Sequence, residues 1–331
     1  MSRKREGVVQ KSAAEFFTEH QQIAGFDNPG KSLFTSIREL VENSLDAAES
    51  IQVLPEIKLS ITEYTEEEHN ELHGIKTKGK KKKASAQDAD TSMDSTEGGS
   101  QFPDSQMTAQ TEVSAMSESQ TSTAKAGAKG KGAKGKKGAA VKAEKGQMYY
   151  KVSCEDNGCG IPEENIGKML GTVLSGSKHG VRQTRGKFGL GAKMALIWSK
   201  KSSGLPINVR TAHATSAEAR PSPIIDVVLD MDIYRNQPKT LSRESTKNTE
   251  QWRGTEIVIT IGGNWTTYRS RTLQYFQQLA VITPYAKLEV NFECTRDPSK
   301  SFTASFARRS EQMPRCVIGW FIFIRLYLRM I

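Results

Sequence analysis

The sequence predicts an α+β fold: an α/β sandwich with a mixed, mostly antiparallel sheet that carries its helices on one face. Short segments of alternating apolar residues predict strands at 57–61, 149–154, 226–229, 256–261 and 287–292. Apolar residues at helical spacing predict helices at about 32–50, 189–200 and 269–280. Because several predicted strands follow one another without a helix between them, they can pair antiparallel, which argues against a doubly wound parallel sheet.

The amino-acid composition limits the classes of function that fit this chain. The 331 residues carry a formal net charge of +10, which is typical of proteins that contact nucleic acid but is shared by other basic proteins. The four cysteines form no Cys-x-x-Cys pair and have no histidine cluster beside them, so we expect reduced thiols rather than a zinc site. The start of the chain lacks the apolar core of a secretory signal, and the one strongly apolar run, 316–331, is too short to span a membrane.

Residues 74–147 differ in composition from their surroundings. They contain 14 lysines and 8 acidic residues but almost no large apolar side chains. Such a segment cannot bury enough apolar surface to offset the entropy of ordering it, so we expect it to be disordered. Strands are predicted on both sides of it, which indicates an insertion in the loop of a hairpin. We therefore predict an N-terminal tail at 1–11, one domain at 12–307 that this insertion interrupts, and an atypical tail at 308–331.

The first candidate motif lies on the predicted helix at 32–50. The sequence RELVENSLDA occupies residues 38–47. At about 100° per residue the apolar side chains point to one side, whereas Glu39, Asn43 and Asp46 point roughly the opposite way. Taken alone, this pattern is also typical of a helix face that is exposed to solvent.

A second candidate motif, EDNGCGIP, follows a predicted strand directly and occupies residues 155–162. In this motif the carboxylate of Asp156 lies at a tight turn that follows the strand. The glycines at this turn, Gly158 and Gly160, allow another group to approach the backbone closely. An ordinary turn would explain the same pattern.

The third candidate motif, RGKFGLGAKMAL, occupies residues 185–196 and leads into a predicted helix. Backbone N–H groups at a helix N-terminus can cradle a phosphate, and Lys187 or Lys193 adds positive charge. The glycine spacing matches neither the Rossmann nor the Walker motif. By itself the motif is weak evidence for a nucleotide site.

Together the motifs form an ordered set that resembles the GHKL ATPases, the superfamily of gyrase, Hsp90, MutL and histidine kinases. The set consists of Glu-x-x-x-Asn on a helix, Asp-x-Gly-x-Gly after a strand, a glycine-rich segment before a helix, and Gly254-Thr255 before a strand. Within the superfamily the chain is similar to the family of topoisomerase VI B subunits, most clearly in segments 12–50, 174–199 and 281–292. The resemblance covers roughly residues 12–73 and 148–307. MutL proteins share a similar first motif, but their lid sequence GFRGEAL is absent here.

The resemblance implies a Bergerat-type ATPase fold, ATP and Mg²⁺ as cofactors, and a role for each motif. Asn43 would hold the Mg²⁺ ion that bridges the phosphates, and Glu39, one helical turn away, would be the general base. Glu42 is the alternative base, but it projects about 100° from Asn43. Asp156 would accept a hydrogen bond from the adenine amino group. The other residues that would bind the nucleotide, in the pocket or in a lid over the triphosphate, are Asp46, Gly158, Gly160, Ser177, Lys178, Gly186, Lys187, Phe188, Gly189, Leu190, Gly191, Ala192, Lys193 and Thr255.

The resemblance also implies partners. ATP would close two B subunits into a clamp on double-stranded DNA, while a separate A subunit cuts the DNA through a tyrosine. No membrane partner is expected. The lysine run at 76–83, beside a DNA-linked ATPase domain, favours a location in the nucleus, although a solvated loop without a targeting role would contain the same run.

The sequence departs from the family after residue 307. Family members continue into a helix-two-turns-helix domain and a transducer domain, whose lysine reaches the γ-phosphate, and residues 308–331 resemble neither. We interpret this tail as the product of a truncated or mis-spliced gene model, with a genuine short isoform as the alternative. Two other functions stay open: an ATP-binding interaction module that is related to the meiotic recombination complex and has lost turnover, and a MutL-type mismatch-repair ATPase.

Overall fold

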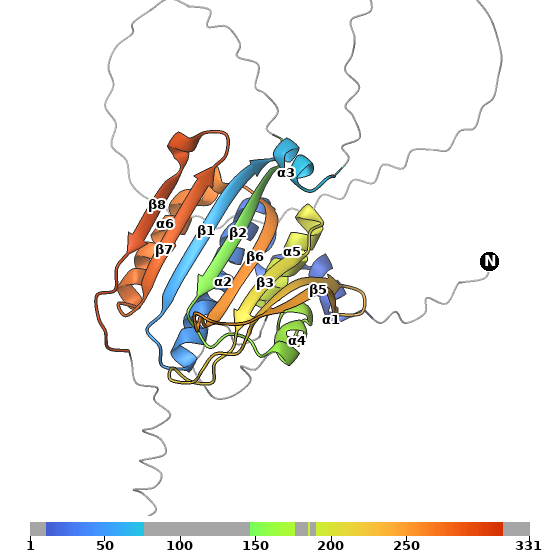
Figure 1. The fold of residues 1–331 in the computed structure, drawn as a ribbon. Helices are drawn as coiled ribbons and strands as arrows, with labels where there is room; N and C mark the ends of the chain where they lie inside the picture. The colour runs from blue at the N-terminus through green and yellow to red at the C-terminus, as the bar shows by residue number, and fades with distance from the viewer. Residues whose placement is uncertain (1–10, 76–145, 176–184, 186–189, 314–331) are drawn as a thin grey trace, which may run out of the picture. The chain divides into compact units, whose positions relative to one another are not determined.

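An eight-stranded sheet forms the centre of the part of the chain that the computed structural model describes, residues 11–75, 146–175, 185 and 190–313. The strand order is β5-β4-β3-β6-β2-β1-β7-β8 (Figure 1). Every neighbouring pair is antiparallel except β1 and β7, which are parallel. The strands are β1 (Glu56–Thr65), β2 (Met148–Asp156), β3 (Ile207–Ala212), β4 (Ile224–Asp232), β5 (Gln237–Thr246), β6 (Gly254–Gly263), β7 (Lys287–Cys294) and β8 (Phe302–Phe306).

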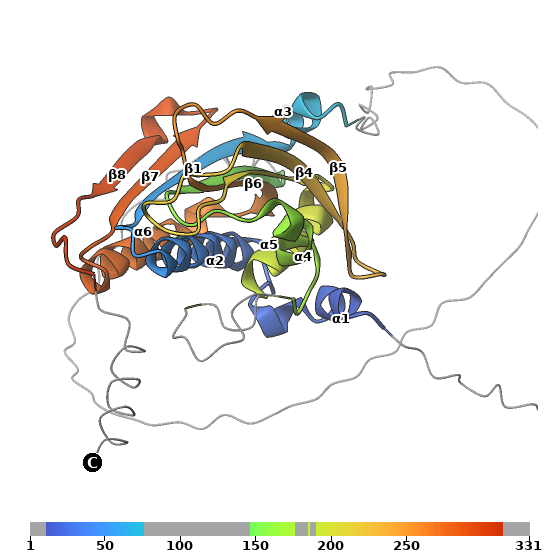
Figure 2. The ribbon, with the colours of Figure 1, turned by 60° about the horizontal axis from the view of Figure 1, so that its bottom comes forward.

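The larger helices lie together on one face of this sheet. Figure 2 shows α2 between α5 and α6, with the strands above all three. The helices are α1 (Ala13–Glu19), α2 (Pro29–Ser50), α3 (Glu66–Leu72), α4 (Ile166–Gly171), α5 (Gly191–Ser203) and α6 (Trp265–Ile282), with short 3-10 turns η1 (Gln21–Ala24), η2 (Glu163–Asn165) and η3 (Pro298–Lys300). This arrangement confirms the predicted α+β fold with a mostly antiparallel sheet and helices on one face.

The central helix α2 forms because its sequence combines a start signal with one continuous apolar stripe. The side chain of Asn28 accepts a hydrogen bond from the backbone N–H of Lys31 (2.8 Å), and Pro29 occupies the first helical position. The apolar stripe that the sequence predicts is buried against the sheet and the neighbouring helices: Leu33, Ile37, Leu40, Val41, Leu45 and Ala48. Burial of each larger side chain in this stripe stabilises the fold by about 1.5–3 kcal/mol.

Strands β1 and β2 pair with each other along their whole length, from Ile57 opposite Asp156 to Thr65 opposite Met148. The sequence predicts a long insertion between them, at 74–147. Residues 76–145 of that insertion lie outside the described part of the chain. The pairing places the two strands that flank the insertion in the middle of the sheet.

Among the described residues, helices cover the sheet on one face only, and the strands alternate between buried and more exposed side chains accordingly. In β1, Ile57, Leu59 and Ile61 are buried under the helices, whereas Lys58 and Ser60 point to the other face. Strand β5 is different, because it stands at the edge of the sheet and is exposed along nearly all of its ten residues. Within the described residues, no helix is long and apolar enough to cross a membrane.

Candidate nucleotide-binding site

Three of the predicted site residues share one face of α2. Glu39, Asn43 and Asp46 are spaced four and three residues apart, which brings helical side chains to the same side. The side chains of Glu39 and Asp46 are only 17% and 5% exposed. The polar face of α2 is therefore covered by other parts of the chain and is not a simple solvent-exposed surface.

The carboxylate of Glu39 lies between an arginine and the start of α5. Arg38 Nη2 donates to Glu39 Oε1 at 2.7 Å, and Arg38 Nε is also 3.7 Å from Glu42 Oε1. On its other side, Glu39 lies against Gly191, where any Cβ atom would overlap the carboxylate. Burial, followed by the charge of Glu39, raises the pKa of Glu42. Glu39 is thus the carboxylate of this pair that touches the glycine-rich segment.

Asp156 ends β2 in a buried position beside α2. Its Oδ1 accepts hydrogen bonds from the backbone N–H groups of Gly158 (2.8 Å) and Thr255 (3.2 Å). Burial raises the pKa of Asp156 to about 6, while these N–H groups and the hydroxyl of Ser44 oppose the rise. Ser44 follows Asn43 on α2, so this contact joins the end of β2 to the polar helix.

Glycines allow the end of β2 to approach α2 closely. A Cβ atom at Gly158 would come within 2.6 Å of Ala47 Cβ on α2, and the next residue, Cys159, donates its N–H to the Ala47 carbonyl at 3.2 Å. Gly254 has a φ of +124° and packs against the Asp156 carbonyl, where a side chain has no room. Gly160, with a φ of +65°, packs in the same way against the carbonyl that ends β3.

The predicted lid residues are described only in part. Ser177, Lys178, Gly186, Lys187, Phe188 and Gly189 lie outside the described residues. Leu190, Gly191 and Ala192 are half-buried at the start of α5. Lys193 is buried (2% exposed), and its ammonium group donates to the carbonyl oxygen of Ser175. Desolvation lowers the pKa of Lys193 to about 8. In this structure the Lys193 cation is thus engaged by the protein itself.

Sequence reasoning missed a cluster of charged residues beside the polar face. Arg185 donates to both Asp46 and Glu49 on α2, and the hydroxyl of Tyr285 donates to Glu49 at 2.8 Å. Arg185 is the first residue of the glycine-rich motif, which was the one available signal. Its partners lie 136 and 139 positions away in the sequence, so no local pattern could have found them.

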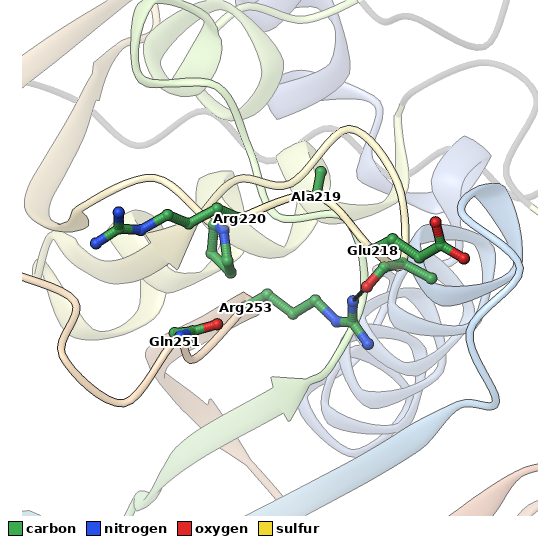
Figure 3. A pocket seen from close by; sticks show the side chains of 7 residues that line it. Glu218, Ala219, Arg220, Gln251 and Arg253 are labelled. Carbon is green, nitrogen blue, oxygen red and sulfur yellow. Dashed lines mark hydrogen bonds between the residues drawn. The ribbon is translucent and has the colours of Figure 1, made fainter.

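A cavity of about 560 Å³ lies elsewhere on the molecule. It is lined by the loop 217–221 together with Gln251 and Arg253, and Arg253 donates to the Ala217 carbonyl across it (Figure 3). None of the predicted site residues lines this cavity. The described residues also contain no group of three or more His, Cys, Asp or Glu side chains that could hold a metal ion.

Comparison with known proteins shows which proteins this chain resembles. No family model matches the chain. The B subunit of DNA topoisomerase 6 from Arabidopsis thaliana is 44% identical over 93% of this chain, and that from Oryza sativa subsp. japonica is also 44% identical over 93%. The B subunit of the type 2 DNA topoisomerase 6 from Saccharolobus islandicus is 28% identical over 94%. The chain spans 41–43% of the length of these curated relatives.

Two solved structures share parts of the fold. The N-terminal domain of a DNA repair protein has a TM-score of 0.41 at 14% identity, with 91% of this chain and 59% of that chain covered. The MutL ATPase domain of Aquifex aeolicus complexed with ADP has a TM-score of 0.35 at 11% identity, with 91% and 66% covered. Both likenesses are too distant to support an argument about this chain.

The structure is an α/β sandwich with one helix layer, in which α2, with Glu39, Asn43 and Asp46, lies beside the strand end that carries Asp156. Over 93% of its length, the chain is a homologue of the DNA topoisomerase 6 B subunit. The resemblance on which the sequence interpretation rested is thereby confirmed.

Proposed function

We propose that this chain is the ATP-binding and ATP-hydrolysing part of the B subunit of a topoisomerase VI. One observation carries the proposal: the polar face of α2 meets the end of β2, so that Glu39, Asn43 and Asp156 belong to one region although Asp156 is more than 100 positions away in sequence. The homology to the DNA topoisomerase 6 B subunit over 93% of the chain supports the same assignment.

The environment of Asp156 fits a bound adenine. An ionised carboxylate has about four acceptor sites, and the N–H groups of Gly158 and Thr255 occupy only part of that capacity on Oδ1. An amino group that approached the buried carboxylate would find an acceptor in a site of low water content, where a hydrogen bond is stronger. Thr255 and the glycine turn would form the walls of this adenine pocket.

The side chains of Asn43 and Glu39 on α2 are suited to the triphosphate part of a bound ATP. The side-chain oxygen of Asn43 is a ligand type that Mg²⁺ accepts, and a bound Mg²⁺ would neutralise charge on the phosphates. Glu39 would orient a water molecule and accept its proton as the water attacks the terminal phosphate. Backbone N–H groups at the start of α5, near Gly191, would face the phosphates together with the predicted lid residues.

The wider assembly is part of the same proposal. The protein would dimerise when ATP binds and would act on double-stranded DNA together with a DNA-cleaving A subunit. It would work in the nucleus, with the lysine run at 76–83 as the targeting signal. A relative that has lost turnover would bind ATP without hydrolysing it, so hydrolysis distinguishes the two functions.

The test uses the full 331-residue chain and two variants. Glu39→Gln should bind Mg²⁺-ATP as tightly as the unmodified chain but hydrolyse it about 10²–10⁴-fold more slowly, because only the proton acceptor is lost. Asn43→Ala should weaken the binding of ATP only when Mg²⁺ is present. The control is Asn208→Ala on β3, which points to the uncovered face of the sheet. If the unmodified chain fails to bind ATP, or if Glu39→Gln hydrolyses ATP at the unmodified rate, the proposal is wrong.

A further inference from the structure

A buried threonine on β3 lies beside the backbone segments that hold the Asp156 carboxylate. Thr211 is 0% exposed and stands directly opposite Thr255 on the neighbouring strand β6. Opposite residues of an antiparallel pair place their side chains on the same face of the sheet, and the two hydroxyl oxygens are 3.3 Å apart. Thr211 belongs to none of the sequence motifs, so its place beside Asp156 becomes visible only in the folded chain.

The Thr211 hydroxyl joins two segments that are far apart in the sequence. The backbone N–H of Ile161, in the turn that follows Asp156, donates to this hydroxyl at 2.8 Å. The hydroxyl in turn donates to the carbonyl oxygen of Gly254, at the start of β6, at 3.0 Å. The same turn and the same end of β6 supply the two backbone N–H groups that donate to the Asp156 carboxylate. Thr211 therefore connects both sources of these N–H groups.

The number of available protons fixes the direction of each hydrogen bond in this group. A hydroxyl has one proton to donate and two lone pairs that accept. Thr211 accepts from the N–H of Ile161 and gives its proton to the Gly254 carbonyl, which can only accept. In the contact between the two hydroxyls, Thr255 is then the donor, and the second lone pair of Thr211 is the acceptor. Since its proton is used in this way, the Thr255 hydroxyl has only lone pairs left.

A hydroxyl that can only accept distinguishes between the groups of a bound base. Thr255 begins next to the Asp156 carboxylate, because its own N–H donates to Asp156 Oδ1 at 3.2 Å. An amino group has two protons to donate and suits a site with two neighbouring acceptors. A carbonyl group in the same place would meet only lone pairs, and no hydrogen bond could form.

We propose that Thr211 is a positioning residue for recognition of the base. It holds the Thr255 hydroxyl as a hydrogen-bond acceptor, so that the site binds a base with an amino group and rejects one with a carbonyl group at that position. The inference rests on the proposed ATP site and deepens it, because it adds a residue that acts on the nucleotide through Thr255.

A purely structural role for Thr211 would have a different consequence. Loss of the hydroxyl would deprive the Ile161 N–H and the Gly254 carbonyl of this partner, and the loosened turn would bind all nucleotides more weakly to a similar extent. In a positioning role, the freed Thr255 hydroxyl can turn its proton toward the base. The site would then tolerate a carbonyl group, and its preference for an amino group would fall.

The experiment measures by calorimetry, with the full chain, the dissociation constants of Mg²⁺-ATP and of Mg²⁺-ITP, which carries a carbonyl group in place of the amino group. Thr211→Val keeps the shape of the side chain but removes the hydroxyl. It should lower the ratio of the ITP constant to the ATP constant by about tenfold, which equals about 1.4 kcal/mol and is the size of about one hydrogen bond. Thr211→Ser keeps the hydroxyl and should keep the ratio.

The matched control is Thr272→Val on α6, a helix that carries none of the predicted site residues. Thr272 is 1% exposed, and its hydroxyl donates to the Tyr268 carbonyl at 2.9 Å, so this variant also loses a buried hydroxyl with its hydrogen bond. The ratio of the two constants should stay unchanged in it.

The outcomes distinguish this inference from the function on which it rests. If the unmodified chain binds neither nucleotide, the proposed function fails and this inference with it. If the chain binds ATP and Thr211→Val leaves the ratio of the two constants unchanged, only the inference is overturned. Should Thr211→Val unfold, Thr211→Cys provides the same comparison, because a thiol is only a weak donor and a weak acceptor. It should lower the ratio in the same direction, and an unchanged ratio would again overturn the inference.

Discussion

Replacement of Asp156 by asparagine should stabilise the protein at neutral pH while it weakens nucleotide binding. Asparagine has nearly the same shape, and its oxygen can still accept the N–H groups of Gly158 and Thr255. It removes a buried negative charge, whose desolvation outweighs the hydrogen bonds that Gly158, Ser44 and Thr255 donate to it. The buried carboxylate therefore lowers the stability of the fold, and the adenine site would require it nonetheless.

The magnitude follows from the pKa of Asp156, which burial raises from 3.8 to about 6. The free-energy difference between these two pKa values is about 3 kcal/mol. Below pH 3.8 the carboxyl is protonated in both the folded and the unfolded chain, so the cost is absent. As pH rises toward 6, the unfolded chain loses the proton while the folded chain retains it, and stability falls. Above about pH 6 the full cost of about 3 kcal/mol is present.

The assay is urea unfolding of the full chain and of Asp156→Asn between about pH 4.5 and pH 8. The advantage of the variant in unfolding free energy should grow with pH and level off above about pH 6, at no more than about 3 kcal/mol. Asp226→Asn on the uncovered face of the sheet is the matched control. A variant that is equally or less stable at neutral pH, with no growth of the difference across this range, would show that the reasoning about the buried charge is wrong. Unchanged ATP affinity in the variant would remove Asp156 from the adenine site.

Three further changes test other features. Gly158→Ala should destabilise the fold by about 1–3 kcal/mol in urea unfolding, because its Cβ atom would overlap α2 at Ala47; equal stability would contradict that contact. Deletion of 74–147 should leave ATP affinity unchanged but flatten the salt dependence of DNA binding, because its lysines would release counterions; an unchanged slope refutes a DNA role for the insertion. Deletion of 76–83 should abolish nuclear accumulation of a tagged chain, and unaltered accumulation excludes this run as the signal.

The elements with strong apolar patterns could be predicted from the sequence, although their ends could not. Helix α2 begins at Pro29 and not at about 32, because its start is fixed by the side chain of Asn28 and lies outside the apolar stripe. Helix α5 begins two residues later than predicted, at Gly191. In both cases the apolar period locates the middle of a helix, while the ends depend on local hydrogen bonds.

Other elements were missed because they are short or lack a periodic signal. Strand β5 is exposed on both sides, so polar residues occupy nearly every position and no alternation results. Strand β3 is only six residues long, and β8 only five. These strands are specified by pairing with neighbours, which a short sequence window does not contain.

In the candidate site, too, some features could be predicted from the sequence and others could not. The three residues on α2 could be placed together from their spacing, whereas the approach of Asp156 was implied only by the family resemblance. Arg185 could not be found, because it reaches α2 from 136 positions away. Lys193 was expected to add positive charge to a phosphate loop, and the structure shows its cation bound to the Ser175 carbonyl. Side-chain direction depends on packing, and packing is not readable from the motif alone.

The exposure of β5 has a consequence for how the protein behaves at high concentration. In the described part of the chain, β5 pairs on one side only, with β4, so about every second residue along its other edge presents its backbone groups outward. Such an edge can nucleate aggregation by accepting a strand from another molecule. Pro238 cannot donate to an added strand, and Lys239 and Arg243 would bring like charges together in a pair of identical edges. The residues that make β5 hard to recognise as a strand are thus the ones that protect it from unwanted self-association.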